Sequence, residues 1–496
     1  MSNRKKTIIT FSILLILTNL IFIPWLNGHM ATDSYNIYNL GYQGYNQDYS
    51  LIDARFLVAL GTTIMDILNV PIQAYSIIIL EVALILSCIT IMVLVKTIEK
   101  WKHPKNLWSE ILLIIACYYS IFNFMYIENL YYIECAGMAA SILLYILAAK
   151  NIVEKNKWWV PESFLFLWIG LMGYQGTISI FFLALIVFSM CKQESAKGIA
   201  QNFFKGLCIS LVAILLSQVE IKIVSQILQV QQSRDLRLSL IENNIIFILS
   251  NFLRVLKSVG YYLPQYSFLI MLAVMEILIF TKAIHQNRKK QDNKNASMII
   301  EQLVIIILGI GAGFIVSIMN TSGFWSGRIR FSIGALIGFL WIHLWIKTDF
   351  AETKNALNMI LVISLIGYGI LNSVNYIAIM IQQKQVSAFD EETVFVMSQE
   401  VHEYESKNNI EVTKVAIVVD RANTSRAFYA KVGYIGSMVT CSSIRTQWAA
   451  AGCYNYYSGS NLETYIPTVE EQRSFLNQNV QYQCIDDILY IAAYMY

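Results

Sequence analysis

The stretch MSNRKKTIITFSILLILTNLIFIPWL (residues 1–26) places three consecutive basic residues directly before a predominantly apolar run. An apolar helix of about 20 residues is long enough to cross the hydrocarbon core of a bilayer. The run is longer than the apolar region of a usual signal peptide, and no small-residue cleavage site follows it. We therefore expect residues 7–25 to form a retained first membrane span.

Similar apolar runs recur along most of the chain. Of its 496 residues, 56% are hydrophobic and 14% are charged, whereas soluble domains carry about 25% charged residues. We expect an α-helical polytopic membrane protein with about eleven transmembrane helices. The expected spans are residues 7–25, 73–97, 107–124, 132–149, 159–173, 176–191, 206–226, 266–284, 298–319, 331–347 and 357–382. Residues 55–70 are apolar but short, and we expect them to lie on the membrane surface.

Basic residues assign a side to each loop. One set of alternate loops holds Arg4, Lys5, Lys6, Lys96, Lys100, Lys102, Lys105, Lys150, Lys155, Lys157, Lys192, Lys197, Lys205, Arg288, Lys289, Lys290, Lys294, Lys347 and Lys354. The other set holds Arg55, Arg234, Arg237, Arg254, Lys257, Arg328 and Arg330. Because cytoplasmic loops carry the excess of Lys and Arg, we expect the N-terminus and the first set to be cytoplasmic. An odd number of spans then places the C-terminal tail outside.

The tail, residues 383–496, differs in composition from the membrane part, residues 1–382. The stretch KVAIVVD (414–420) is typical of a buried strand, and EETVFVMSQEVHEYESKNN (391–409) of an amphipathic helix. TVEEQRSFLNQN (468–479) predicts another helix that Thr468 caps. We expect a small extracytoplasmic α/β domain. Its thirteen acidic and eight basic residues argue against binding of nucleic acid or another anionic polymer.

Charged residues are few on the expected outer face, and they include carboxylates and arginines. Asp33 follows the first span, Glu128 and Glu134 flank the second outer loop, and Arg328 and Arg330 precede a late span. Taken singly, such residues at span ends are usually solvated or anchor the helix at the interface. Taken together, they suit the transfer of a sugar from a lipid phosphate. A carboxylate accepts a proton from the acceptor hydroxyl, and arginine forks hold the phosphate.

Four motifs resemble those of a known family. They are TDSY (32–35), DAR (53–55), GYQG (173–176) and GRIRFSIGALIGF (327–339). Over about residues 7–382 the chain resembles the polytopic bacterial glucosyltransferases related to the O-antigen seroconversion proteins, which have a GT-C type architecture. The family tends to have a Gly-Arg pair where this chain has DAR, so the role of Arg55 follows less directly from the resemblance.

The resemblance implies a function and a set of site residues. A hexose, most often glucose, would move from a polyprenyl-phosphate donor to a cell-surface glycan at the outer face of the bacterial plasma membrane. Because all the candidate residues lie on the expected outer face, Asp33 would be the general base or a carboxylate that orients the acceptor, with Glu128 or Glu134 as a second carboxylate. Arg328 and Arg330, and less directly Arg55, would hold the donor phosphate. Tyr35, Tyr174 and Gln175 would line the sugar and acceptor pocket.

Several alternatives stay open at the level of sequence. A transporter or flippase would carry charges near mid-membrane and inverted repeats, whereas here the polar residues gather in outer loops. The sequence distinguishes a glycan ligase or polymerase of the same general fold only weakly from a sugar transferase. Asp33 with a glutamate could ligate a divalent cation, although we expect no metal and no other cofactor. Sequence spacing does not decide whether Cys441 and Cys453 form a disulfide.

Overall fold

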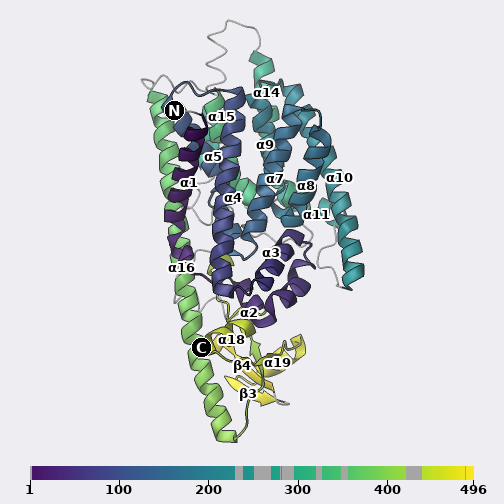
Figure 1. The fold of residues 1–496 in the computed structure, drawn as a ribbon, viewed down its shortest axis with the longest axis vertical. Coiled ribbons are helices and arrows are strands. Elements are labelled where there is room, and N and C mark those ends of the chain that lie inside the picture. Colours follow the sequence, from purple (N-terminus) through teal and green to yellow (C-terminus); the bar gives the residue numbers. More distant parts are fainter. Residues whose placement is uncertain are drawn as a thin grey trace.

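The chain folds into a long helical bundle with a small α/β domain at one end, as the computed structural model shows (Figure 1). The structure describes residues 3–229, 238–250, 270–279, 281, 295–319, 327–347, 356–419, 438–485 and 488–495. The bundle helices are α1 (Asn3–Leu26), α4 (Ile72–Trp101), α5 (Leu107–Ile121), α7 (Cys135–Glu154), α8 (Trp159–Gly173), α9 (Ser179–Cys191), α10 (Ala196–Leu228), α11 (Leu238–Ser250), α14 (Asn295–Met319), α15 (Phe331–Lys347) and α16 (Ala356–Asn408).

The structure confirms a helical membrane protein, while the number of crossings stays a prediction. Within the described residues, six helices are long and apolar enough to cross a bilayer: Arg4–Leu26, Ile72–Trp101, Cys135–Glu154, Ala196–Leu228, Gln302–Met319 and Met359–Asn408. The expected spans at 107–124, 159–173, 176–191 and 331–347 correspond to shorter apolar helices. The expected span 266–284 lies partly outside the described residues. Wholly outside them are Arg234, Arg237, Arg254, Lys257 and the loop residues 320–326.

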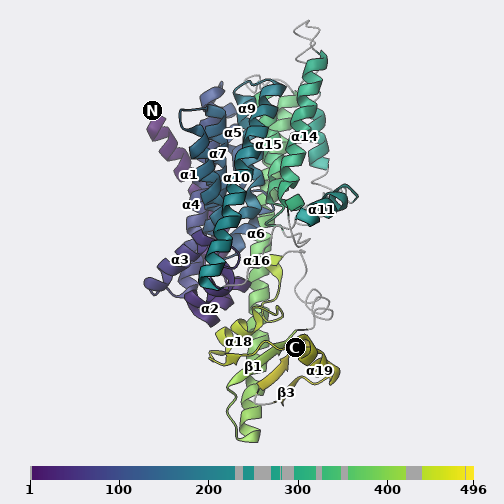
Figure 2. The same cartoon turned by 90° about the vertical axis from the view of Figure 1, so that its right-hand side faces the viewer.

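Within the described part of the chain, the lysine-bearing loops between α4 and α5, between α7 and α8 and between α9 and α10 lie at the end of the bundle that carries the N-terminus (Figures 1 and 2). Three ion pairs link neighbouring helices there. Lys6 pairs with Glu110, Lys100 Nζ lies 3.0 Å from Glu154 Oε1, and Lys155 Nζ lies 4.0 Å from a carboxylate oxygen of Glu194. The C-terminal domain lies at the opposite end. The side of the membrane on which each end of the bundle lies stays a prediction.

Short elements cover the end of the bundle near the C-terminal domain. They are α2 (Thr32–Tyr45), η1 (Asn46–Ser50), α3 (Phe56–Ile67), α6 (Tyr126–Tyr131) and η2 (Gln175–Thr177). In α3, Val58, Ala59 and Thr62 are buried against the bundle, whereas Leu60 and Ile67 are exposed. An amphipathic helix with one apolar face left uncovered is typical of a membrane surface. The expectation that residues 55–70 lie on that surface stays a prediction.

The C-terminal domain contains a four-stranded mixed sheet. Its strands are β1 (Lys414–Val418), β2 (Glu463–Thr464), β3 (Tyr482–Ile485) and β4 (Ile488–Ala492), in the order β2-β1-β4-β3. β1 is parallel to β2 and β4, and β3 is antiparallel to β4. The remaining elements are η4 (Met438–Thr440), α18 (Ala450–Ser458), α19 (Val469–Asn477) and η5 (Ala493–Met495). Thr468 caps α19 in a capping box with Glu471, as the sequence predicts.

One helix runs through the boundary that the sequence predicts at residues 382–383. Helix α16 is 53 residues long and continues from the bundle to Asn408. The composition changes from apolar to polar along it, but the stretch 371–408 contains neither glycine nor proline. A change of polarity does not end a helix when no residue breaks it. The last expected span and the expected amphipathic helix are therefore parts of one continuous helix.

Candidate active site

Asp33 lies in the first turn of α2, just beyond the end of α1. The chain reverses through Gly28, whose φ of 94° is in the left-handed region. The Ser34 hydroxyl then accepts a hydrogen bond from the Ala31 N–H at 3.1 Å, which helps to fix the start of α2. Asp33 is partly exposed, whereas Thr32 and Ser34 on either side of it are buried. A carboxylate is thus held at a fixed point on the end of the bundle with access to solvent.

The surroundings of Asp33 shift its titration towards neutral pH. Burial raises the pKa of the Asp33 carboxyl to about 6, and the negative charge of Glu134 adds to the rise. The positive charges of Arg328 and Arg55 oppose it, as does a hydrogen bond from the side chain of Trp448. These four residues come from three parts of the bundle and from the C-terminal domain. The raised pKa fits a general base that works near neutral pH.

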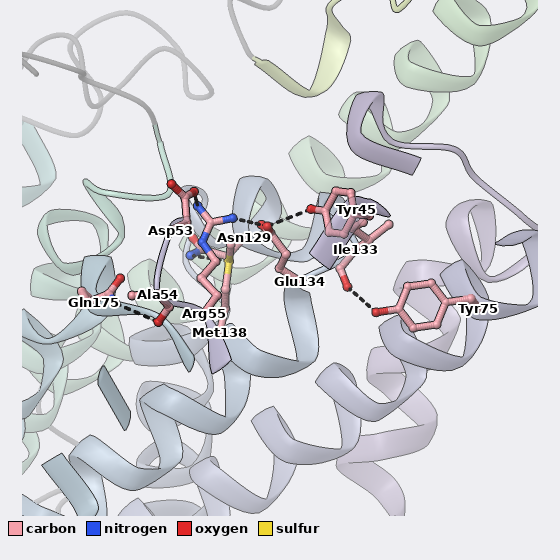
Figure 3. Close-up of polar contacts among 10 residues, drawn as sticks. All are labelled: Tyr45, Asp53, Ala54, Arg55, Tyr75, Asn129, Ile133, Glu134, Met138 and Gln175. Carbon is pink, nitrogen blue, oxygen red and sulfur yellow. Dashed lines mark hydrogen bonds and ion pairs between the residues drawn. The ribbon is translucent and has the colours of Figure 1, made fainter. Parts of the chain in front are cut away.

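Arg55 lies in a buried ion cluster, which Figure 3 shows, and its charge acts on Asp33. Its Nη2 lies 2.8 Å from Asp53 Oδ2, and its Nη1 contacts Glu134 Oε1. The Tyr45 hydroxyl donates to the same Glu134 oxygen at 3.0 Å. The side chains of Arg55 and Glu134 are only 5% and 1% exposed. Two carboxylates therefore pair with Arg55, and the cluster is suited to positioning the charges around Asp33.

The backbone just before Arg55 is strained, and this segment contacts Tyr174 and Gln175. Ala54 has a φ of 56°, a left-handed conformation that costs free energy for a residue other than glycine. The Gln175 side-chain amide donates to the Ala54 carbonyl at 3.4 Å, and the guanidinium carbon of Arg55 lies 5.7 Å from the centre of the Tyr174 ring.

Glu128 holds the segment that carries Arg328. The backbone N–H groups of Gly327 and Arg328 donate hydrogen bonds to its carboxylate. A Cβ atom at Gly327 would lie 2.1 Å from Glu128 Oε2, so any larger residue there would have to displace the Glu128 carboxylate. Burial raises the pKa of Glu128, while Arg328, Arg330 and the two backbone donors oppose that rise. The guanidinium carbon of Arg328 lies 4.2 Å from the centre of the Tyr132 ring, in a cation–π contact.

The C-terminal domain is held against α2 on the opposite side of Asp33 from the bundle core. The Tyr35 hydroxyl donates to the Tyr457 hydroxyl at 2.9 Å. Asn455 Nδ2 donates to Asn39 Oδ1 at 3.0 Å. A Cβ at Gly452 would lie 2.3 Å from the Tyr35 carbonyl oxygen, so α18 packs directly on the α2 backbone. This packing brings Trp448, which precedes α18, to Asp33.

The structure brings together most of the residues that the sequence predicts for the site. Asp33, Arg55, Glu134 and Arg328 interact electrostatically, Glu128 interacts with Arg328 and Arg330, and Tyr174 and Gln175 contact the segment around Arg55. Tyr35 is placed elsewhere, since its ring is buried against α18. It lies two positions after Asp33, and residues two apart on a helix face different ways.

Three residues of the site are missing from the sequence prediction. Tyr45 and Tyr132 resemble the many tyrosines at span ends, which usually form interface belts. Trp448 is more than 400 positions away from Asp33, and nothing in the local sequence marks it. Among the described residues, no three or more His, Cys, Asp or Glu side chains form a group that could hold a metal ion. Cys441 and Cys453 are both free cysteines.

Comparison with known proteins adds no relative. No family model matches the chain. No curated protein and no solved structure is similar to it.

Proposed function

We propose that this protein is a membrane glycosyltransferase. It would move a hexose, glucose in the first instance, from a polyprenyl-phosphate donor to a cell-surface glycan at the outer face of a bacterial plasma membrane. The observation that carries the proposal is Asp33. It is a partly exposed carboxylate whose pKa burial raises to about 6, beside Arg328 at one end of a membrane bundle. The basic loops at the opposite end support an extracytoplasmic position for this site.

The proposed reaction is a single displacement at the anomeric carbon of the sugar. Asp33 accepts the proton of the acceptor hydroxyl while the acceptor oxygen forms its bond to that carbon. The bond from the carbon to the phosphate oxygen breaks, and its electron pair leaves with the lipid phosphate. Asp33 later releases the proton to water. Because attack and departure occur on opposite faces of the sugar, the anomeric configuration inverts.

Arg328 is the best placed residue to hold the departing phosphate. Its guanidinium keeps its charge at any working pH, and it can contact two phosphate oxygens at once. Glu128 fixes the backbone at Arg328, and Arg330 lies near the same carboxylate. Arg55 forms ion pairs with both Asp53 and Glu134. We assign Arg55 and Glu134 to positioning the charged groups around Asp33, and Glu128 to positioning Arg328.

The direct test replaces Asp33 by Asn and measures sugar transfer in membranes supplied with polyprenyl-phosphate-glucose and the acceptor glycan. Loss of the proton acceptor should lower the rate by about 100- to 10,000-fold. Asp48→Asn is the matched control, because Asp48 lies in the same stretch but is exposed. Full activity of Asp33→Asn at normal expression would contradict the assignment. Movement of a lipid-linked sugar across vesicles without transfer would instead favour a flippase, and a change in glycan chain length would favour a polymerase or ligase.

A further inference from the structure

A groove lies near the N-terminal end of the bundle, far from the site around Asp33. It is formed by α1, α4 and α7 and has a volume of about 450 Å³. Phe11 on α1 and Ile89 and Met92 on α4 line its apolar part. Ile8 on its wall is 55% exposed, so the groove is open to the surroundings of the bundle. Because α1 and α4 are long apolar helices that can cross a membrane, these surroundings are the hydrocarbon of the bilayer.

The other end of the groove is basic. Lys96, Lys100 and Lys150 line it together with one carboxylate, Glu154. Lys96 Nζ lies 2.7 Å from Glu99 Oε2, and Lys100 Nζ lies 3.0 Å from Glu154 Oε1. Lys150 is half-buried and forms no ion pair with any residue that the structure describes. Three lysines against two glutamates leave one positive charge without a counter-charge.

Apolar and basic surfaces therefore meet in one groove at the depth where a lipid changes from tail to head group. Lysines at helix ends extend towards the interface and attract anionic head groups. A basic cleft between membrane helices on the cytoplasmic side is the kind of site in which anionic lipids bind. A zwitterionic lipid brings no net charge to compensate Lys150.

We propose that this groove binds an anionic phospholipid of the inner leaflet. Its phosphate would lie at Lys150 and Lys96, and one acyl chain would lie along Phe11 and Ile89. The site is separate from the proposed sugar-transfer site and does not depend on that function. Bound lipid would fill the space between α1 and the helices α4 and α7, and so stabilise the docking of α1.

Native mass spectrometry of the purified full chain tests the proposal. The protein is mixed in detergent with phosphatidylglycerol, with phosphatidylcholine or with a polyprenyl phosphate of similar chain length. We expect retained phosphatidylglycerol and at least about tenfold less phosphatidylcholine, which is the factor that 1.4 kcal/mol represents. Equal retention of the two phospholipids would refute the proposal. Preferential retention of polyprenyl phosphate would assign the groove to that lipid instead and would also refute it.

Two variants locate the binding. Lys96→Gln/Lys150→Gln should lose phosphatidylglycerol, while the matched control Lys197→Gln, an exposed lysine at the same end of the bundle, should keep it. Ile89→Trp leaves every charge in place and fills the groove from a side chain that is 36% exposed. It should lose the lipid as well. Unchanged retention in either the double variant or Ile89→Trp would overturn the assignment. Asp33→Asn should bind lipid normally even if sugar transfer is lost.

Discussion

Replacing Glu134 by Gln should move the acid limb of sugar transfer to lower pH. In the proposed reaction only the ionised Asp33 is active, and its pKa of about 6 makes activity fall as the pH falls through 6. Glu134 contributes a like charge that raises this pKa. Its removal lowers the pKa because this repulsion disappears, while the positive charges of Arg55 and Arg328 still favour the ionised carboxylate.

The size of the effect follows from the charges. With a pKa of about 6, roughly 90% of Asp33 is ionised at pH 7, and kcat/KM should fall about tenfold for each pH unit below 6. A unit charge several ångströms away in a partly buried site changes a pKa by on the order of one unit. The acid limb of Glu134→Gln should therefore lie on the order of one pH unit below that of the unmodified protein.

The assay is kcat/KM for transfer from polyprenyl-phosphate-glucose between pH 4.5 and 8, in detergent or in vesicles. The thermal midpoint of each variant shows whether its fold is intact. Asp48→Asn should reproduce the profile of the unmodified protein, because Asp48 is exposed. An acid limb below pH 5 in the unmodified protein would refute the role of burial at Asp33. Identical limbs in the unmodified protein and in Glu134→Gln would refute the coupling between the two carboxylates.

Substitutions at three further positions, with matched controls, probe the structure around this carboxylate. Trp448→Phe removes a hydrogen bond to the ionised carboxyl, so the acid limb should move to higher pH, opposite to the Glu134 variant. Gly327→Ala places a Cβ against Glu128 Oε2 and should lower kcat/KM by about 100-fold. The matched control is Gly309→Ala, which should leave kcat/KM unchanged because a Cβ at Gly309 meets nothing within 4 Å. Ala54→Gly should keep the thermal midpoint, whereas Ala54→Val should lower it because positive φ is costly for a β-branched residue.

Much of the architecture is predictable because the bilayer imposes a simple pattern on the sequence. Long apolar runs predict α1, α4, α7, α10 and α14, whereas the side of the membrane on which each loop lies stays a prediction from the basic residues. The capped helix α19 follows from a local motif. The continuity of α16 is missed because its change of polarity is taken for a domain boundary, although no helix-breaking residue occurs there.

The candidate site is predictable only in part, because its chemistry depends on contacts between distant segments. The sequence places Asp33, Glu128, Glu134 and Arg328 on one expected face but cannot distinguish a base from a positioning carboxylate. That distinction comes from partners. Glu134 is paired with Arg55, and Glu128 accepts backbone N–H groups, whereas Asp33 stays partly exposed. Contacts from the C-terminal domain carry no local sequence signal.

Helix α16 makes the geometry at Asp33 sensitive to the thickness of the bilayer. Its 53 residues span about 80 Å, and the part beyond residue 382 extends about 40 Å past the expected membrane boundary. A helix whose apolar length exceeds the hydrocarbon thickness tilts. A tilt of about 5° would displace the far end of this part of α16 sideways by about 3 Å. That displacement is as large as the length of a hydrogen bond. Lipids that thin or thicken the membrane would thereby pull the C-terminal domain against its contacts with α2 and alter the hydrogen bond between Trp448 and Asp33.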